Sequence, residues 1–205
     1  MGCENSEEKP NEIVPDQIMV TSNKNNKVNA NINNKDNSYN KNDILGLIQP
    51  KKKSKKDKFI EDCLKKHNEL RILHGVQPLK ISEELNKIAQ KFAEYLAEID
   101  KIKLSYNIYK GEELGENIFC CLGNEIQGDI MTMSWYDEIN KYDFNNPGFL
   151  SEAGHFTQII WKDTKEVGFG FAKSSSGIYY GVGNYYPAGN INTKEEFINN
   201  VLKRI

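Results

Sequence analysis

The sequence contains no run of about 20 apolar residues, which is the length that a helix needs to cross a bilayer. Its first thirty residues also lack the apolar block of a secretory signal peptide. We therefore expect neither a membrane-spanning helix nor a cleaved leader, and we expect the mature chain to begin at its own amino terminus.

Net charge is also small, because 27 basic residues nearly balance 29 acidic ones and the formal net charge is −2. A balance of this kind produces no field over the whole molecule that would attract a polyanion. The sequence therefore predicts no nucleic-acid partner, and electrostatic recognition must be local.

Cysteines are few and badly spaced for disulfides. Cys3 is near the terminus, Cys63 lies in a predicted helix, and Cys120 and Cys121 are adjacent. The chain is rich in asparagine, yet it has no Asn-x-Ser/Thr glycosylation sequon. Both absences favour reduced thiols in the cytosol. We expect Cys120 and Cys121 to fill space in the core rather than to react.

The amino-terminal quarter of the chain lacks the composition of a folded domain. Half of the residues from Asn23 to Asn42 are asparagine, and aromatic residues are almost absent. Such a segment cannot bury enough apolar surface to offset the entropy lost on ordering. We therefore predict a disordered, Asn/Lys-rich tail over residues 1–57 and one globular domain over residues 58–205.

The first six residues, Met-Gly-Cys-Glu-Asn-Ser, fit the pattern for myristoylation of Gly2, and Cys3 is then a candidate for palmitoylation. Two acyl chains give stable membrane attachment, whereas one gives only marginal binding. The alternative is an unmodified start followed by two small residues. A lysine cluster between Lys51 and Lys58 either contacts anionic lipid or keeps the tail in solution.

Apolar spacing predicts helices in the first half of the domain. A stripe from Phe59 to Leu70 recurs every three or four residues, and a second stripe follows Ser82, a plausible helix cap, and runs to Ile99. A third helix is predicted from about Asn124 to Tyr142, with Glu138 on its core-like face.

Beyond Pro147 the pattern changes to β-branched and aromatic residues with glycines at the margins. We predict strands over Gly154–Trp161, Glu166–Lys173 and Ile178–Tyr186, and a short final helix over Thr193–Leu202. Helices followed mostly by strands indicate an α+β domain with helices covering one sheet.

Four motifs together resemble the CAP superfamily, which comprises cysteine-rich secretory proteins, antigen five and plant pathogenesis-related proteins (the SCP domain). They span nearly the whole domain. They are His-Asn-Glu-Leu-Arg at residues 67–71, Gly-Glu-Asn-Ile at 115–118, Gly-His-Phe-Thr-Gln-Ile-Ile-Trp at 154–161 and Asn-Tyr-Tyr-Pro-Ala-Gly-Asn at 184–190.

The resemblance is strongest to the Golgi-associated, non-secreted branch, because the disulfide cysteines are missing and Gly183 stands where secreted members usually carry cysteine. It implies an α-β-α sandwich with a central mixed sheet and a location on the cytosolic face of membranes. It also implies binding of sterols, anionic phospholipids or protein partners, and formation of homodimers. Export by an unconventional route is the alternative.

CAP domains gather two histidines and two glutamates in a central cleft that in several members holds zinc. By resemblance, His155 on the predicted strand, Glu116 in the Gly-Glu-Asn turn and Glu138 on the third helix supply three of these. The other histidine has no counterpart, and Ser105 falls near its place. One imidazole and two carboxylates make a weak zinc set, although a water could complete it.

Three interpretations of Glu116, Glu138 and His155 remain open: a buried polar network, a metal or ligand cleft, and a catalytic site. No dedicated nucleophile is evident. The sequence therefore favours a membrane-tethered binding or scaffold protein that requires no cofactor. A metal-assisted hydrolase or protease centred on His155 is the alternative.

Overall fold

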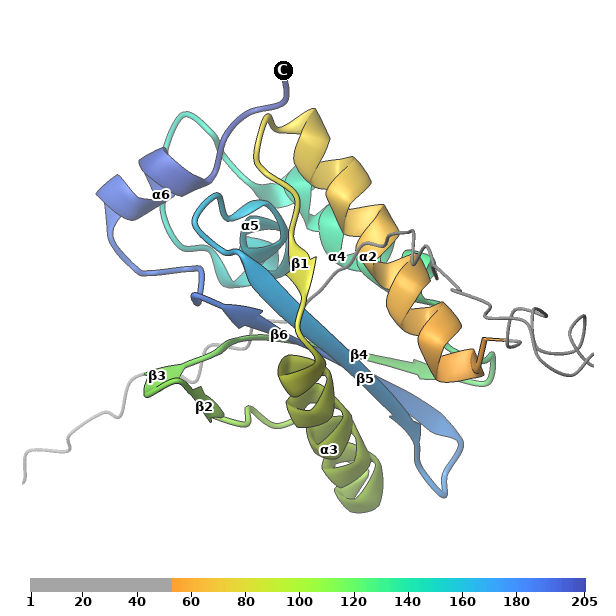
Figure 1. The fold of residues 1–205 in the computed structure, drawn as a ribbon. Coiled ribbons are helices and arrows are strands. Elements are labelled where there is room, and N and C mark those ends of the chain that lie inside the picture. The colour runs from red at the N-terminus through yellow and green to blue at the C-terminus, as the bar shows by residue number, and fades with distance from the viewer. Residues whose placement is uncertain (1–52) are drawn as a thin grey trace, which may run out of the picture.

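The computed structural model describes residues 53–205 (Figure 1). The predicted acylation sites Gly2 and Cys3 and the asparagine-rich tract lie outside the described residues. Within 53–205, no helix has both the length and the apolar character needed to cross a membrane.

A four-stranded sheet lies at the centre, in the order β1-β5-β6-β4. β1 (Lys80–Ile81) runs parallel to β5 (Glu166–Lys173), whereas β6 (Ile178–Tyr186) is antiparallel both to β5 and to β4 (Gly115–Leu122). The sheet is therefore mixed, as expected, and β5 and β6 match their predicted ranges. β4 was missed, because its Gly-Glu-Asn motif was interpreted as a turn.

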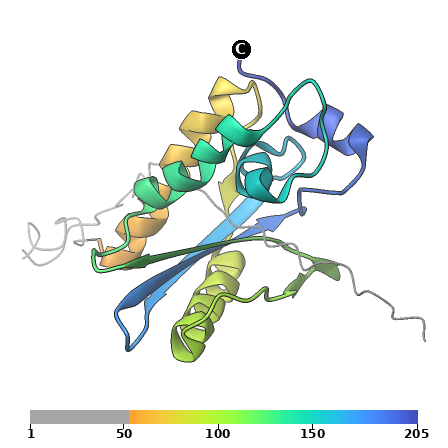
Figure 2. The ribbon, with the colours of Figure 1, turned by 180° about the vertical axis from the view of Figure 1, so that it is seen from behind.

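Helices cover both faces of the sheet (Figures 1 and 2). α3 (Glu83–Ile99) packs against β5 and β6 on one face. α2 (Lys55–Leu73), α4 (Gly128–Tyr136) and α5 (Gly154–Ile160) lie together on the other. Each face has its own cluster of buried apolar side chains. The predicted α-β-α sandwich is confirmed.

Side-chain caps explain where two helices begin. The Ser54 side chain accepts a hydrogen bond from the Asp57 backbone, and Asp57 caps Ser54 in return, so α2 starts at Lys55. That start lies three residues ahead of the domain boundary expected from composition. Ser82 accepts from the Leu85 backbone at 3.3 Å and starts α3 where the sequence predicted.

Two predictions about local structure were wrong. Gly154–Trp161 forms helix α5 rather than a strand, because its apolar residues Phe156, Ile159 and Ile160 follow helical spacing and are fully buried. The third helix is also shorter than predicted, since α4 ends at Tyr136 and a 3-10 turn, η1 (Asp137–Lys141), carries Glu138.

A short connection leads from α3 to β4 through the two-stranded hairpin of β2 (Ile108–Tyr109) and β3 (Glu112–Glu113). The chain ends in α6 (Lys194–Asn200) and a tail whose last residue, Ile205, donates its N–H to the Leu73 carbonyl at 3.0 Å. The predicted final helix is thus confirmed over slightly fewer residues.

Glycines in β5 allow α3 to lie unusually close to the sheet. A Cβ atom at Gly168 would collide with the backbone of Leu85 and Asn86, and one at Gly170 would collide with the backbone of Gln90. Asn86 uses this proximity, because its side chain accepts the Phe169 N–H at 2.7 Å. The distance between α3 and the sheet therefore depends on glycine, which has no side chain, at positions 168 and 170.

We expect Gly170→Ala to lower the free energy of unfolding by roughly 2 kcal/mol, because the added methyl group pushes α3 away from β5. The control is Gly148→Ala, since a Cβ there has nothing within 4 Å. Urea denaturation of both variants measures the difference. Equal effects on stability would show that the close approach of helix and sheet is not a constraint.

Candidate functional site

Glu116 lies at the start of β4, directly opposite Asn184 in the β4–β6 register. The Asn184 amide donates to the Glu116 carboxylate at 3.2 Å, and the Ser105 backbone N–H donates to its other oxygen at 2.8 Å. The Ser105 hydroxyl also donates to Glu116. The structure therefore brings together Glu116 and Ser105, two of the residues that the sequence assigned to the cavity.

The Glu116 side chain is almost completely buried, with 4% of its surface exposed. Burial raises the pKa of this carboxyl above its usual value of 4.5, because a charge loses solvation in the interior, and the hydrogen bonds from Ser105 and Asn184 partly offset that rise. Glu116 thus holds a proton more readily than an exposed glutamate does.

A cavity of about 290 Å³ opens beside Glu116. Apolar side chains form most of its wall, and Gln158 adds an amide. Its lining includes Leu104, Tyr106, Leu114, Phe149, Ala188 and Asn190. The cavity lies where the connection from α3 to β4 meets the segment that follows β6.

Close packing of glycines on Gln158 shapes one wall of this cavity. The Gln158 carbonyl accepts the Gly189 N–H at 2.8 Å, and its amide donates to Thr164 at 3.2 Å. A Cβ at Gly115 or at Gly189 would overlap the Gln158 side chain. Three of the sequence motifs therefore meet at one amide, which explains why two of them contain glycine at these positions.

Glu138 and His155 form a second pair. The Glu138 carboxylate accepts hydrogen bonds from the His155 backbone N–H, at 3.1 Å, and from the imidazole Nδ1. The His155 ring also stacks on Trp135, with ring centres 6.5 Å apart. The pair joins η1 to the first turn of α5. The imidazole therefore comes from a helix, not from the predicted strand, and Glu116 comes from a strand, not from a turn.

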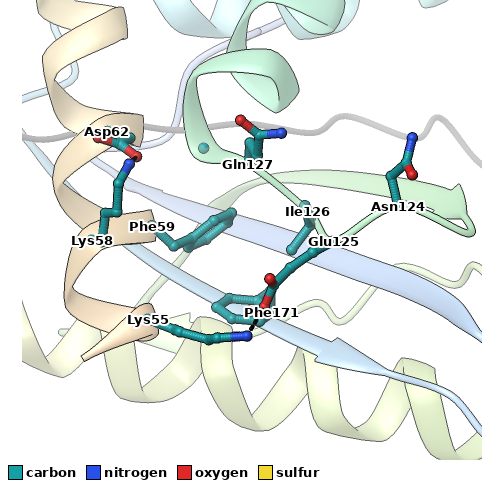
Figure 3. Close-up of a pocket in the computed structure, with 10 residues that line it drawn as sticks. Lys55, Lys58, Phe59, Asp62, Asn124, Glu125, Ile126, Gln127 and Phe171 are labelled. Carbon is teal, nitrogen blue, oxygen red and sulfur yellow. Dashed lines mark hydrogen bonds and ion pairs between the residues drawn. The ribbon is translucent and has the colours of Figure 1, made fainter.

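A larger cavity, of about 430 Å³, lies between the first half of α2 and the segment before α4 (Figure 3). Phe59 and Phe171 form its apolar floor, with ring centres 4.7 Å apart. The charged groups at its rim already neutralise each other, because Lys55 pairs with Glu125 at 2.7 Å and Lys58 pairs with Asp62. The Glu116 cavity, which contains a buried carboxylate, is the better candidate for a site.

The model of the cysteine-rich secretory protein family, CAP, matches residues 64–185, which is more than half of the chain. This chain is a CAP-family protein. The match runs from α2 to the penultimate residue of strand β6 and includes the residues around both polar pairs.

Several CAP relatives cover much of the chain. The human Golgi-associated plant pathogenesis-related protein 1 is 41% identical over 150 residues, which are 73% of this chain and 96% of that protein. Pathogenesis-related protein 1A of Nicotiana tabacum is 32% identical over 63% of this chain and 76% of its own length. Secreted protein RBT4 of Candida albicans is 31% identical over 67% of this chain, but the match spans only 37% of that protein.

Solved CAP structures share the fold. The structure described as NaASP2 with Zn2+ superposes with a TM-score of 0.53 at 21% identity, over 70% of this chain and 84% of that one. BmVAL-1 gives a TM-score of 0.52 at 21% identity, over 66% and 80%. At this level of identity the likeness establishes the architecture alone.

The zinc that the CAP resemblance suggests does not fit the residues as they are placed. Zinc in proteins takes four donors, or three and a water. Among residues 53–205, no three histidine, cysteine, aspartate or glutamate side chains gather closely enough to hold a metal ion. Ser105, at the place of the missing histidine, is hydrogen-bonded to Glu116. We therefore derive no hydrolytic step through a metal.

His67 and His74, the other two histidines, are both buried in the domain. His67 is fully buried, and burial lowers its pKa. His74 is buried between the Leu202 carbonyl, at 2.6 Å, and the Tyr136 hydroxyl, at 2.8 Å. The expectation that both adjacent cysteines fill the core was wrong for Cys120, whose position on the outer strand β4 leaves it exposed.

Arg71 was not recognised as a key residue from the sequence, although it ends the first motif. Its guanidinium is fully buried and donates to four backbone carbonyls: Gln77 and Ile159 at 2.8 Å, Trp161 at 2.9 Å and Thr164 at 3.3 Å. Burial lowers its pKa to about 10. A buried arginine thus ties α2 to the end of α5. The available signal was that Arg71 lies four residues after His67 and therefore on the same buried face of the helix.

We expect Glu116→Gln to flatten the dependence of stability on pH. Because the native pKa of Glu116 is raised, the folded state keeps a proton that the unfolded state releases, so stability falls as pH rises from about 4.5 through the native pKa. Glutamine does not titrate. The stability of the variant relative to the wild type should therefore increase between pH 4 and pH 8.

Urea denaturation across this pH range measures the effect. The control is Glu113→Gln, which removes the same charge from an exposed position three residues away. A difference between Glu116→Gln and wild type that stays constant with pH would contradict the assignment.

Proposed function

We propose that this chain is a membrane-tethered CAP-domain binding protein whose Glu116 cavity takes the apolar body of a lipid, either a sterol or an anionic phospholipid. The observation that carries this proposal is a mostly apolar cavity that ends on a buried carboxylate. Ligand pockets typically combine apolar walls with a few polar groups that fix orientation.

The surface around the cavity is also apolar. Tyr106, one of the lining residues, is 56% exposed, and Ile191, which lies between the lining residues Asn190 and Asn192, is 50% exposed. Leu150, next to the lining residue Phe149, is 38% exposed. Exposed apolar side chains around a cavity support a ligand that continues from the cavity into a membrane or a partner.

Glu116 supplies the polar end of the proposed site. Its carboxyl is held by Ser105 and Asn184, so it is already oriented when a ligand enters. Because burial raises its pKa, it is suited to exchange a hydrogen bond with a lipid hydroxyl rather than to attract a cation. In this role Glu116 is not a metal ligand. Its partner is Ser105, which stands near the place of the cleft histidine that many CAP domains carry.

The proposed tether is acylation of Gly2 and Cys3, which would place the domain on the cytosolic face of a membrane. The name of the human relative, a Golgi-associated protein, supports a membrane location, whereas that of the Candida albicans relative describes a secreted protein. The free thiols of Cys63, Cys120 and Cys121 favour the reducing side. At such a surface the domain would act as a scaffold for protein partners, including a second copy of itself.

We expect Ala188→Phe to weaken lipid binding by roughly tenfold, because the ring fills the Glu116 cavity. The matched control is Asn124→Phe, which puts the same ring at the rim of the other cavity. Saturation binding of radiolabelled cholesterol, and in parallel of a short-chain phosphatidylserine, measures both variants. If Ala188→Phe binds lipid normally and Asn124→Phe does not, the lipid binds in the other cavity and the proposal is contradicted.

We expect Gly2→Ala to shift the protein from the membrane pellet into the soluble fraction in cells, because myristoylation requires this glycine. Cys3→Ser should give a partial shift, since a single acyl chain binds only marginally. Fractionation followed by mass spectrometry of the amino terminus measures both the location and the modification. Unchanged pelleting of Gly2→Ala would reject acyl tethering without affecting the cavity.

A further inference from the structure

Three strands meet around the ammonium group of Lys110, which is not among the residues that line the Glu116 cavity. Tyr109 ends β2, Tyr186 ends β6 and Glu166 begins β5. Glu166 and Tyr186 are partners in the β5–β6 register, so their side chains stand on the same face of the sheet. Lys110 Nζ lies 4.7 Å from the centre of the Tyr109 ring, 4.8 Å from that of Tyr186 and 3.3 Å from a Glu166 oxygen.

The two rings form walls at right angles. Their planes cross at 87° and their centres are 5.3 Å apart. The Tyr109 hydroxyl donates to Glu84 at 2.9 Å, which helps to fix that ring. We call Tyr109, Tyr186 and Glu166 the cation box. Two aromatic faces and a carboxylate around one cation are the elements by which proteins recognise quaternary ammonium groups.

A second lysine–tyrosine contact provides a comparison. Lys173 Nζ lies 4.9 Å from the centre of the Tyr179 ring, on β6. That contact has one ring, and no carboxylate among residues 53–205 pairs with Lys173. The geometry around Lys110 is therefore more than the ordinary packing of a lysine stem on a tyrosine.

We propose that the cation box binds the phosphocholine headgroup of a membrane lipid, with the Lys110 ammonium marking the place of the choline nitrogen. The trimethylammonium group takes the position between the two rings, and Glu166 balances its charge. The Lys110 side chain, 47% exposed and flexible, turns outward to pair with the phosphate, which a short ethylene bridge joins to the nitrogen.

The surroundings favour a bilayer over a soluble choline compound. Ile108, next to Tyr109 in β2, is 58% exposed, and Tyr106 is 56% exposed on the same connection. Tyrosine and lysine are residue types that settle at the membrane–water interface, and the exposed Ile108 adds apolar surface beside them. This site goes beyond the proposed function, because it does not use the Glu116 cavity and does not require an acyl chain.

The test titrates the full chain with soluble phosphocholine and with choline by calorimetry. Tyr186→Leu and Glu166→Gln should each weaken both ligands by roughly threefold to tenfold. Tyr179→Leu, the matched control, should bind like the wild type. Loss of binding in Tyr179→Leu to the same degree, or no saturable phosphocholine binding by the wild type, would overturn the proposal.

Lys110→Asn gives a readout that a purely structural lysine would not. Asn-Gly suits the turn at residues 110–111, where Lys110 has φ 52° and Gly111 has φ 87°, so the hairpin is kept. Without the competing ammonium, choline should bind about threefold more tightly. The wild type should prefer phosphocholine to choline, because Lys110 pairs with the phosphate, and this preference should disappear in Lys110→Asn. An unchanged preference would contradict the role assigned to Lys110.

A vesicle experiment identifies the source of the headgroup. The Gly2→Ala chain, which cannot be myristoylated, is mixed with phosphatidylcholine vesicles and with vesicles in which phosphatidylethanolamine replaces most of that lipid. Stronger binding to phosphatidylcholine, lost in Tyr186→Leu, supports the proposal. Equal binding to both vesicles, or tighter binding of a trimethyl-lysine peptide than of phosphocholine, would overturn the assignment to a lipid. Neither result bears on the cavity variant Ala188→Phe.

Discussion

The structure around the candidate site depends on the burial of the Glu116 carboxyl group, which projects from β4. Such a group is costly to bury unless it is hydrogen-bonded. The register of β4 and β6 brings Asn184 to it from the neighbouring strand, and the connection that follows α3 brings Ser105. Because Ser105 is fixed in this way, its neighbours Leu104 and Tyr106 are placed at the cavity wall. One buried carboxyl thus organises both the polar end of the cavity and its apolar rim.

Much of the fold could be predicted from the sequence where one local signal dominates. The cap at Ser82 and the apolar stripe of α3 indicate a helix, and the β-branched and aromatic residues of β5 and β6 indicate strands. The prediction failed where burial is complete on all sides. α5 is such a case, because its polar residues Thr157 and Gln158 are buried along with its apolar ones, so no polar face marks the helical period. β4 was hidden by a motif that looks like a turn.

The sequence named the candidate residues but did not predict how they are arranged. Glu138 pairs with His155, and Glu116 pairs with Ser105, as two separate groups of hydrogen bonds. No spacing in the sequence reports which of four distant residues will share a bond, since this depends on how η1 meets α5 and how the connection after α3 meets β4. The cation box is a further example. Tyr109, Glu166 and Tyr186 come from three separate strands, and nothing in their sequence context links them.

The central claim is that the Glu116 cavity holds the apolar body of a lipid. Photo-crosslinking with a sterol that carries a diazirine, followed by peptide mass spectrometry, tests this most directly because it maps the bound molecule onto the chain. The account predicts crosslinks at the lining residues of the cavity, in residues 113–116 and 188–190. Crosslinks concentrated in residues 55–62 and 124–128, around the other cavity, would contradict it.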